Sequence, residues 1–310
     1  MSYKIPGIPS AKAYIEELAD FWEIMVLKNF DIPVSARVIQ QELSIELDEL
    51  SHEGIESEDD IVFSRIQDVM NEIINRKSAA YNKYPFDFDG SRLYCNTQVS
   101  NKVKDIYLFC LLATRINMRD NKIQNNIDGT KIFEGLSAIV GKNFWGNNSQ
   151  TMIFGTASDG SFENKVNDAI RLIGEGHSFI NRNSSFVTKN DDGIDIVLVK
   201  EFTDNRRSKL VGLGQCKTGT DWQNTVKGEK IRNFCSNWFR DTPVLEPIPI
   251  AFITDTLYRE SNDYTNLKGL LVLNRFRLME YLPEEIDVVL HGQIQSWVDG
   301  ALEFIKSSNE

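Results

Sequence analysis

Hydrophobic residues in the first 150 positions recur at the spacing of amphipathic helices. Within residues 11–29, Leu18, Trp22 and Met25 fall near a single face, and Ser10 has the side chain of a helix N-cap. The same spacing predicts four further helices, at residues 36–50, 59–83, 98–117 and 129–141. The sequence therefore predicts a helical N-terminal region.

After residue 150 the pattern changes to a mixture of strands and helices. Residues 161–174 are expected to form an amphipathic helix that stops at Gly174. Two apolar runs flank the polar segment 203–208 and predict a β-hairpin with strands at 194–202 and 209–217. The remaining expected elements are a helix at 223–239, strands at 248–254 and 269–274, and a closing helix at 293–307. We therefore expect a helical region (residues 1–150) followed by an α/β domain (residues 151–310).

Acidic residues outnumber basic ones by 45 to 34, which gives a formal net charge of -11. Bulk charge of this sign opposes non-specific attraction to nucleic acid or to an anionic membrane. Much of the excess lies in residues 41–62, the acidic run, which contains nine acidic side chains and no basic one. The acidic run is either a solvated helix face and loop, or a regulatory surface that docks a basic protein partner or shields a DNA-binding groove.

No apolar stretch is long enough to span a membrane. The longest, at residues 106–113, is far short of the roughly 18 residues that a spanning helix needs. The N-terminus lacks an apolar core of the signal-peptide type, so we expect a cytoplasmic protein. The four cysteines are widely spaced without a CxxC pair, and the three histidines are isolated, so neither a disulfide framework nor a zinc site is expected.

Polar side chains around the predicted hairpin form the candidate site. Asp195 lies near the start of the first strand, and Gln215 and Lys217 lie at the end of the second. Because paired hairpin strands run antiparallel, these two ends meet at one edge of the sheet. Side chains two apart share a face, so Gln215 and Lys217 point the same way while Cys216 packs behind them. Glu163, on the preceding helix, is expected to face the same place.

These groups suit hydrolysis of a phosphodiester with the help of a hard divalent cation. Mg²⁺ prefers oxygen ligands, which Asp195, the Gln215 amide and the Cys216 carbonyl would provide. Glu163 would complete the set directly, through water, or by holding a second ion. Lys217 would hold or activate the attacking water and offset charge on the phosphoryl oxygens. Mg²⁺, or Mn²⁺ in its place, is the expected cofactor.

The order of these motifs resembles the PD-(D/E)xK nuclease superfamily. A glutamate on a helix is followed by Gly193-Ile194-Asp195-Ile196-Val197 and then by Gly214-Gln215-Cys216-Lys217. This order is similar to the QxK variant of Mrr-like restriction endonucleases and related antiphage defence nucleases, over about residues 160–256.

The resemblance implies a restriction-endonuclease-like domain, with a central mixed sheet flanked by helices, that cleaves DNA with Mg²⁺. It also implies a homodimer, since cutting both strands needs two sites. Two positions depart from the family pattern. Ile194 stands before the aspartate in place of proline, and Gln215 replaces a second carboxylate, which should weaken metal affinity.

The surroundings of the candidate site are basic, in contrast to the whole chain. Residues 200–240 contain nine Lys and Arg against four Asp and Glu. The side chains expected to contact phosphates are Arg206, Arg207, Lys227, Lys230 and Arg232. Three residues shortly after the hairpin are expected to line the strand-binding groove: Thr218, Thr220 and Trp222. Burial of Trp222 under the next helix is the alternative.

Three functions follow from these observations. The leading one is a metal-dependent DNA endonuclease of the restriction or antiphage defence type, controlled by its helical region. The second is a catalytically weak or inactive nuclease-like scaffold that binds a protein partner. The third is an RNA nuclease, because nothing in the hairpin reads the sugar.

Overall fold

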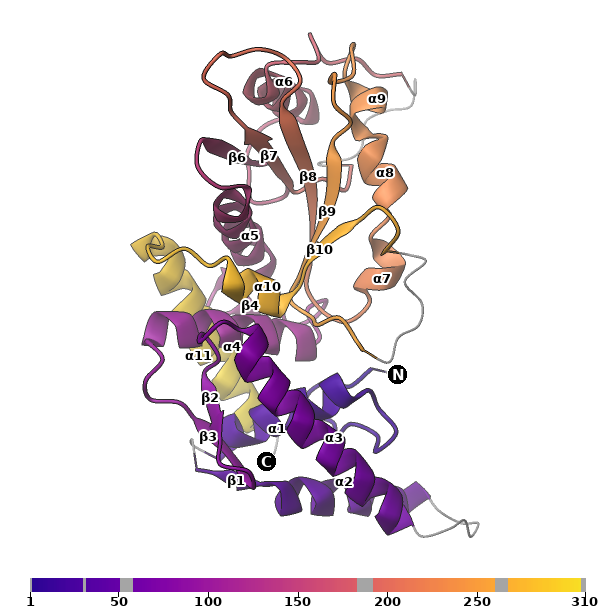
Figure 1. Ribbon diagram of the computed structural model, residues 1–310, viewed down its shortest axis with the longest axis vertical. Helices are drawn as coiled ribbons and strands as arrows, with labels where there is room; N and C mark the ends of the chain where they lie inside the picture. The colour runs from indigo at the N-terminus through magenta and orange to yellow at the C-terminus, as the bar shows by residue number, and fades with distance from the viewer. Residues whose placement is uncertain (1, 30–31, 51–57, 183–191, 260–266, 308–310) are drawn as a thin grey trace.

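The computed structural model describes residues 2–29, 32–50, 58–182, 192–259 and 267–307, without the side chains of residues 44–63. Most of the acidic run therefore lies outside the described side chains. Figure 1 shows an elongated molecule, with a sheet towards one end and most of the N-terminal helices towards the other. None of the described helices has the length and apolar character needed to cross a membrane.

A mixed five-stranded sheet forms the centre of the C-terminal half. Its strands lie in the order β10-β9-β8-β7-β6 and comprise β6 (Ser149–Ile153), β7 (Ile196–Lys200), β8 (Leu210–Lys217), β9 (Ile248–Ile253) and β10 (Leu271–Leu273). Neighbours are antiparallel from β6 to β8 and parallel from β8 to β10. β7 and β8 form the expected hairpin, in which Ile196 pairs with Gly214. The α/β fold and the mixed sheet are confirmed.

One face of the sheet is covered by α5 (Gly129–Trp145). The helix lies close to the strands, because a Cβ added at Gly141 would stand only 3.0 Å from the Phe252 ring and 3.1 Å from Leu198. Leu136 of α5 and Ile196 of β7 belong to the same hydrophobic core. α5 is therefore packed against the sheet although it precedes residue 150.

The opposite face is covered by α6 (Phe162–Ile173), α8 (Gly228–Arg232) and α9 (Phe234–Trp238). Ser161 caps α6 by accepting a hydrogen bond from the Asn164 N–H, and Gly174 ends it in the left-handed conformation, as the sequence predicts. Apolar residues of these helices pack on Val197 and Leu213, which point away from α5.

Three short helices replace the single helix expected at residues 223–239. α7 (Trp222–Thr225) ends because Val226 and Lys227 have extended backbone, with ψ of 123° and 99°. α8 and α9 then follow as separate turns. The break lets Trp222 pack inward while Lys227 and Lys230 remain exposed.

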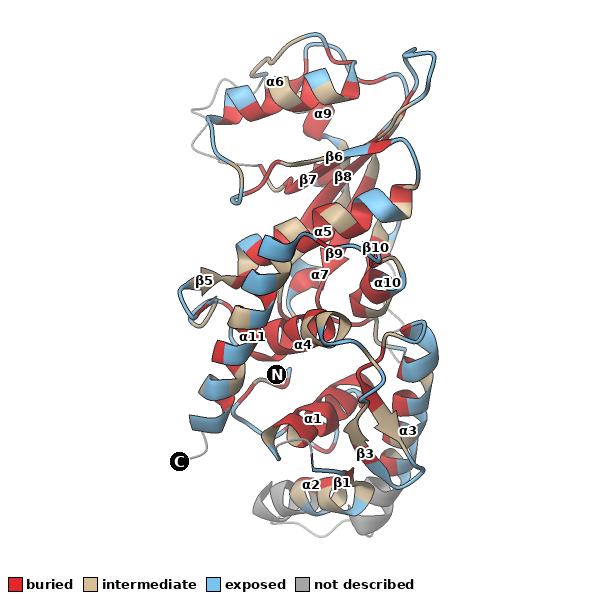
Figure 2. Ribbon diagram, turned by 90° about the vertical axis from the view of Figure 1, so that its left-hand side faces the viewer, coloured by how far each residue is buried: buried red, intermediate tan, exposed pale blue. Residues whose placement is uncertain are grey.

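The N-terminal helices are close to their expected positions, at α1 (Ile15–Lys28), α2 (Ala36–Leu50), α3 (Glu58–Ala79) and α4 (Asn101–Arg115). α1 begins without a side-chain cap after Tyr14, so the expected cap at Ser10 is wrong. α1 is buried on almost every side (Figure 2), because it lies beneath its neighbours rather than on the surface. Short strands also occur here, at β1 (Val34–Ser35), β2 (Phe86–Phe88), β3 (Arg92–Cys95), β4 (Ile123–Gln124) and β5 (Ile127–Asp128).

Helices from both ends of the chain pack together. α10 (Arg275–Glu280) follows β10, and α11 (Val288–Ser307) returns to pack along α4. A single hydrophobic core includes Leu18 of α1, Ile196 of β7 and Trp297 of α11. Packing therefore crosses the expected boundary at residue 150, and the division into two regions stays a prediction. The four cysteines are free, as expected.

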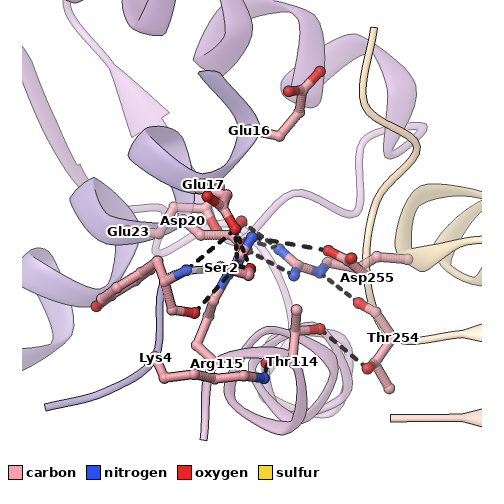
Figure 3. Close-up of polar contacts among 12 residues, drawn as sticks. Ser2, Lys4, Glu16, Glu17, Asp20, Glu23, Thr114, Arg115, Thr254 and Asp255 are labelled. Atoms are coloured by element: carbon pink, nitrogen blue, oxygen red, sulfur yellow. Dashed lines mark hydrogen bonds and ion pairs between the residues drawn. The ribbon is translucent and has the colours of Figure 1, made fainter. Parts of the chain in front are cut away.

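A buried cluster of charges joins the N-terminal helices to the sheet (Figure 3). The Asp20 carboxylate of α1 accepts hydrogen bonds from Arg76, Arg115 and Arg275, with N–O distances of 2.6 to 3.1 Å. All four side chains are fully buried. Burial opposes ionisation of Asp20, but the three guanidinium groups outweigh it and hold its pKa well below the usual range.

This cluster is connected to the candidate site through one residue. Arg275 donates to the Thr254 carbonyl at 3.0 Å, and Thr254 directly follows β9. The Thr254 N–H in turn donates to the Lys217 carbonyl at 3.2 Å. The end of β8 is thus connected by hydrogen bonds to the fully buried charge cluster.

Candidate functional site

A pocket of about 470 Å³ lies where β7 begins and β8 ends. Its lining consists of Thr130, Phe133, Glu134, Thr156, Asp192, Gly193, Asp195, Gln215, Cys216, Lys217, Thr218 and Lys230. The structure thus brings together four expected site residues, Asp195, Gln215, Cys216 and Lys217. The antiparallel pairing of β7 and β8 places them there, because the first strand starts opposite the end of the second.

The backbone fixes Asp195 from both sides. Its N–H donates to the Gly214 carbonyl at 2.8 Å, and its carbonyl accepts from the N–H groups of Phe154 (2.7 Å) and Gly155 (3.1 Å). Its carboxylate Oδ2 accepts from the Cys216 N–H at 2.7 Å. The side chain is 9% exposed, so it reaches solvent only through the pocket.

Gln215 and Lys217 lie on the same face of β8, as the alternation of the strand predicts. Cys216 points the other way, towards α5. Burial, and then the negative charge of Asp195, raise the pKa of the Cys216 thiol well above its usual value. Because the thiolate is the reactive form of cysteine, this residue is unsuited to nucleophilic chemistry.

Glu134 of α5 is the second carboxylate of the pocket. It is 4% exposed, and it accepts hydrogen bonds from the Thr156 N–H (3.1 Å), the Thr156 hydroxyl (2.8 Å) and the Ala157 N–H (2.8 Å). A Cβ placed on Gly155 would be 2.7 Å from both Glu134 Oε2 and Asp195 Oδ1. The two oxygens are therefore separated by no more than twice that distance.

Glu163 does not reach this pocket. It is exposed on α6 and is not among the residues that line the pocket. The expectation that Glu163 joins Asp195 and Lys217 is therefore corrected: Glu134 is the glutamate that helix packing delivers. α6 contributes Lys165 instead, whose buried ammonium donates to the Gly155 carbonyl at 2.9 Å.

The donor set fits a magnesium-type cation but not a three-ligand metal centre. Within the described ranges, no group of three or more His, Cys, Asp or Glu side chains is placed to hold a metal ion. Mg²⁺ in nucleic-acid enzymes is usually held by one or two carboxylates, with phosphate and water completing the octahedron. Glu134 and Asp195 are the two carboxylates that line the pocket, and Oε2 of one lies no more than about 5.4 Å from Oδ1 of the other. Gln215 and Cys216, whose amide and carbonyl oxygens the sequence proposes as neutral ligands, also line the pocket.

The basic residues fall into two groups. Lys230 borders the pocket, and its ammonium lies 3.3 Å from the Asp192 carboxylate. Lys227 precedes α8 directly and Arg232 ends it, and both line a groove together with Lys230. Arg206 and Arg207 are instead at the turn of the hairpin, five or more residues along β8 from Gln215 and so at least roughly 17 Å away. The structure does not bring them to the pocket.

The residues expected to line a strand-binding groove also divide. Thr218 borders the pocket, whereas Thr220 borders a separate pocket formed with the N-terminal segment. Trp222 is 2% exposed, and its indole N–H donates to Asp255 at 3.3 Å. The expectation that Trp222 lines the groove is therefore wrong, and the alternative, burial, is correct.

Two residues were missed by reasoning from the sequence. Glu134 lies in the middle of the expected helix 129–141. The one signal in the sequence that could have marked it as a site residue is that this helix is the last one before the sheet. Asp192, a second pocket residue that the sequence does not single out, has positive φ (47°) and accepts a hydrogen bond from the Trp238 indole at 2.8 Å. Asp192 therefore forms part of the turn, contacts the buried Trp238 and lines the pocket.

Comparison with family models, with curated proteins and with solved structures finds no match to this chain. The features that bear on function are therefore the geometry of the pocket and the resemblance of its motifs.

Proposed function

We propose that this protein is a metal-dependent endonuclease that hydrolyses DNA at the pocket between β7 and β8. The observation that carries the proposal is the convergence of Glu134, Asp195, Gln215 and Lys217 at one edge of the sheet. The mixed sheet with helices on both faces supports a restriction-endonuclease-like domain. A role in restriction or antiphage defence, a homodimer and a cytoplasmic location rest on the resemblance and on the sequence.

The pocket residues have two roles: some would bind the metal ion, and Lys217 would stabilise charge on the phosphate. Glu134 and Asp195 would hold Mg²⁺ or Mn²⁺, with help from the oxygens of Gln215 and Cys216. When bound, the cation supplies Lewis-acid polarisation of the phosphate and a more acidic water. Lys217 places a positive charge beside the scissile phosphate, where negative charge increases in the transition state. The buried hydrogen bonds to both carboxylates keep this arrangement fixed before substrate binds.

The decisive experiment compares variants on supercoiled and linear DNA with Mg²⁺ or Mn²⁺. We expect Lys217→Ala, Asp195→Ala and Glu134→Gln to lower the cleavage rate by about 10²-fold or more, since each removes a charge that acts on the reacting phosphate. Glu163→Gln is the matched control and should cleave as the unaltered protein does. Equal cleavage by all four variants would refute the site. If Glu163→Gln alone lost cleavage, the metal ligand would be Glu163 on α6 and not Glu134.

The second candidate is a nuclease-like scaffold without strong catalysis. It is favoured by the fact that protein donors already satisfy both oxygens of Glu134 and one oxygen of Asp195. Calorimetric titration with Mn²⁺ distinguishes the two: the nuclease predicts binding that Asp195→Ala removes, and the scaffold predicts none. Digestion of RNA beside DNA tests whether the protein is instead an RNA nuclease.

A further inference from the structure

A second groove adjoins the pocket, and most of its charged lining residues are cations. It has a volume of about 800 Å³ and is lined by residues of α8, α9 and the segment that leads into β10. Figure 1 shows α8 and α9 on one side of the sheet. Its charged side chains are Lys227, Lys230, Arg232, Lys268 and a single acid, Glu229. The groove therefore carries a local charge of three positive units on a chain whose net charge is -11.

Among the described residues, the cations of this groove are only partly compensated: Lys230 pairs with Asp192. Lys227 and Lys268 are exposed, and among the described residues neither forms an ion pair. Arg232 is half-buried, and its guanidinium donates to the Gly269 carbonyl at 3.1 Å, a contact that positions it without neutralising it. Cations in a surface groove repel one another, and a bound polyanion would relieve that repulsion.

The groove and the candidate site share a lining residue. Lys230 borders both the 470 Å³ pocket and the 800 Å³ groove, and its ammonium pairs with Asp192 at the boundary between them. Two amide side chains, Asn233 and Asn237, lie on the same wall and can donate to phosphate or sugar oxygens. A strand whose phosphate sits beside Lys217 would meet this wall on leaving the pocket.

We infer that the groove between Lys227 and Lys268 binds the sugar–phosphate backbone of the DNA strand that enters the pocket. This inference rests on the proposed function and adds the path of the substrate. Contacts of this type position a strand without reading its sequence, and they make affinity depend on salt. Lys268, which lies outside the region that the sequence marked as basic, is assigned to the interface by the fold.

The test is DNA binding by the full chain, measured by fluorescence anisotropy over a range of salt concentrations with a chelator present, so that no cleavage occurs. The groove variant is Lys227→Gln with Lys268→Gln. The matched control, Arg206→Gln with Arg207→Gln, removes the same two charges at the far end of the hairpin. We expect the groove variant to bind roughly tenfold or more weakly and to lose about two units of the salt slope, whereas the control keeps both.

Unchanged affinity in the groove variant, equal losses in both variants, or no binding by the unaltered protein would each overturn the inference. Thermal melts of both variants show whether the fold is retained, and a Lys230→Gln variant tests the same surface independently. Cleavage assays separate this inference from the proposed function. If Lys217→Ala abolishes cleavage while the groove variant binds normally, the nuclease stands and the groove does not.

Discussion

Gly155 lies where the two carboxylates of the pocket meet the backbone. The oxygens of Glu134 and Asp195 both approach the position that a Cβ would occupy there, while Lys165 holds the Gly155 carbonyl from behind. The backbone at Gly155 does not require positive φ, so space rather than conformation is what keeps this residue a glycine. The close approach of the carboxylates therefore depends on one missing methyl group.

Gly155→Ala should displace one or both carboxylates, because contacts of 2.7 Å are shorter than a Cβ tolerates. We expect Mn²⁺ affinity and cleavage to fall by about tenfold or more, by loss of positioning, with the far-ultraviolet circular dichroism spectrum retained. Gly292→Ala is the control, since nothing lies within 4 Å of its added Cβ. Normal metal binding by Gly155→Ala would show that the carboxylates do not act as a pair.

Lys4 provides a pH-dependent test of the contact between the N-terminal segment and α4. Burial, reinforced by the nearby charge of Arg115, lowers the pKa of Lys4 to about 8, and its ammonium donates to the Thr114 carbonyl. Between about pH 8 and the ordinary lysine value of 10.5, the unfolded chain binds more protons than the folded one. The free energy of unfolding should therefore rise with pH across this window and be insensitive to Lys4 below it.

Lys4→Met should remove that rise, which is at most about 1.4 kcal/mol for each pH unit. Urea titrations at several pH values between 7.5 and 10.5 measure it, and Lys12→Met, at an exposed position nearby, is the control. An identical slope in Lys4→Met and in the unaltered protein would contradict a buried, perturbed lysine.

At the scale of elements, the hairpin is held by a residue from outside it. Glu175 follows α6, is 6% exposed, and accepts hydrogen bonds from the N–H groups of Ser208 (2.8 Å), Lys209 (3.3 Å) and Val244 (2.7 Å). These contacts tie the turn of the hairpin to the loop before β9. The register that brings Asp195 opposite Gln215 is thus stabilised from its far end.

Glu175→Ala leaves three N–H groups without their acceptor, and we expect the free energy of unfolding to fall by about 1–3 kcal/mol. Glu175→Gln keeps one acceptor oxygen and should recover part of the loss. Chemical denaturation measures both, with Glu246→Ala at an exposed position as the control. Equal stability of Glu175→Ala and the control would show that the clamp is not needed.

The boundaries of helices and strands agree with the sequence patterns in some segments and differ in others. The helix 161–174 and both hairpin strands were predicted to within two residues at each end, because a cap, a terminal glycine and alternation mark them locally. The expected helix 223–239 was not, because burying Trp222 and Phe234 on the sheet requires a change of direction at Val226 and Lys227. Packing overrode helical periodicity there.

At the scale of the whole molecule, the buried cluster around Asp20 connects helices from distant parts of the sequence. Arg76, Arg115 and Arg275 come from α3, α4 and α10, and they meet on a single carboxylate. Arg275 continues the connection through Thr254 to the strand of Lys217. Removing one member would leave charge buried without its partner.

Asp20→Asn should lower the free energy of unfolding by about 3–5 kcal/mol, because three guanidinium groups lose their shared counter-charge. Asp87→Asn breaks the exposed pair with Lys77 and should change stability by less than about 1 kcal/mol. Chemical denaturation of both variants decides the matter. A small effect for Asp20→Asn would mean that Glu23 and the remaining acids compensate fully.

The sequence by itself determined the α/β class, the hairpin, and the meeting of Asp195 with Gln215 and Lys217, because alternation and antiparallel pairing are local rules. Only the tertiary structure decided which glutamate lines the pocket with them. Glu134 and Glu163 both lie on amphipathic helices, and no local pattern says which face of the sheet a helix covers. That choice depends on how α5, α6 and the buried arginines pack around the sheet, which is a property of the whole chain.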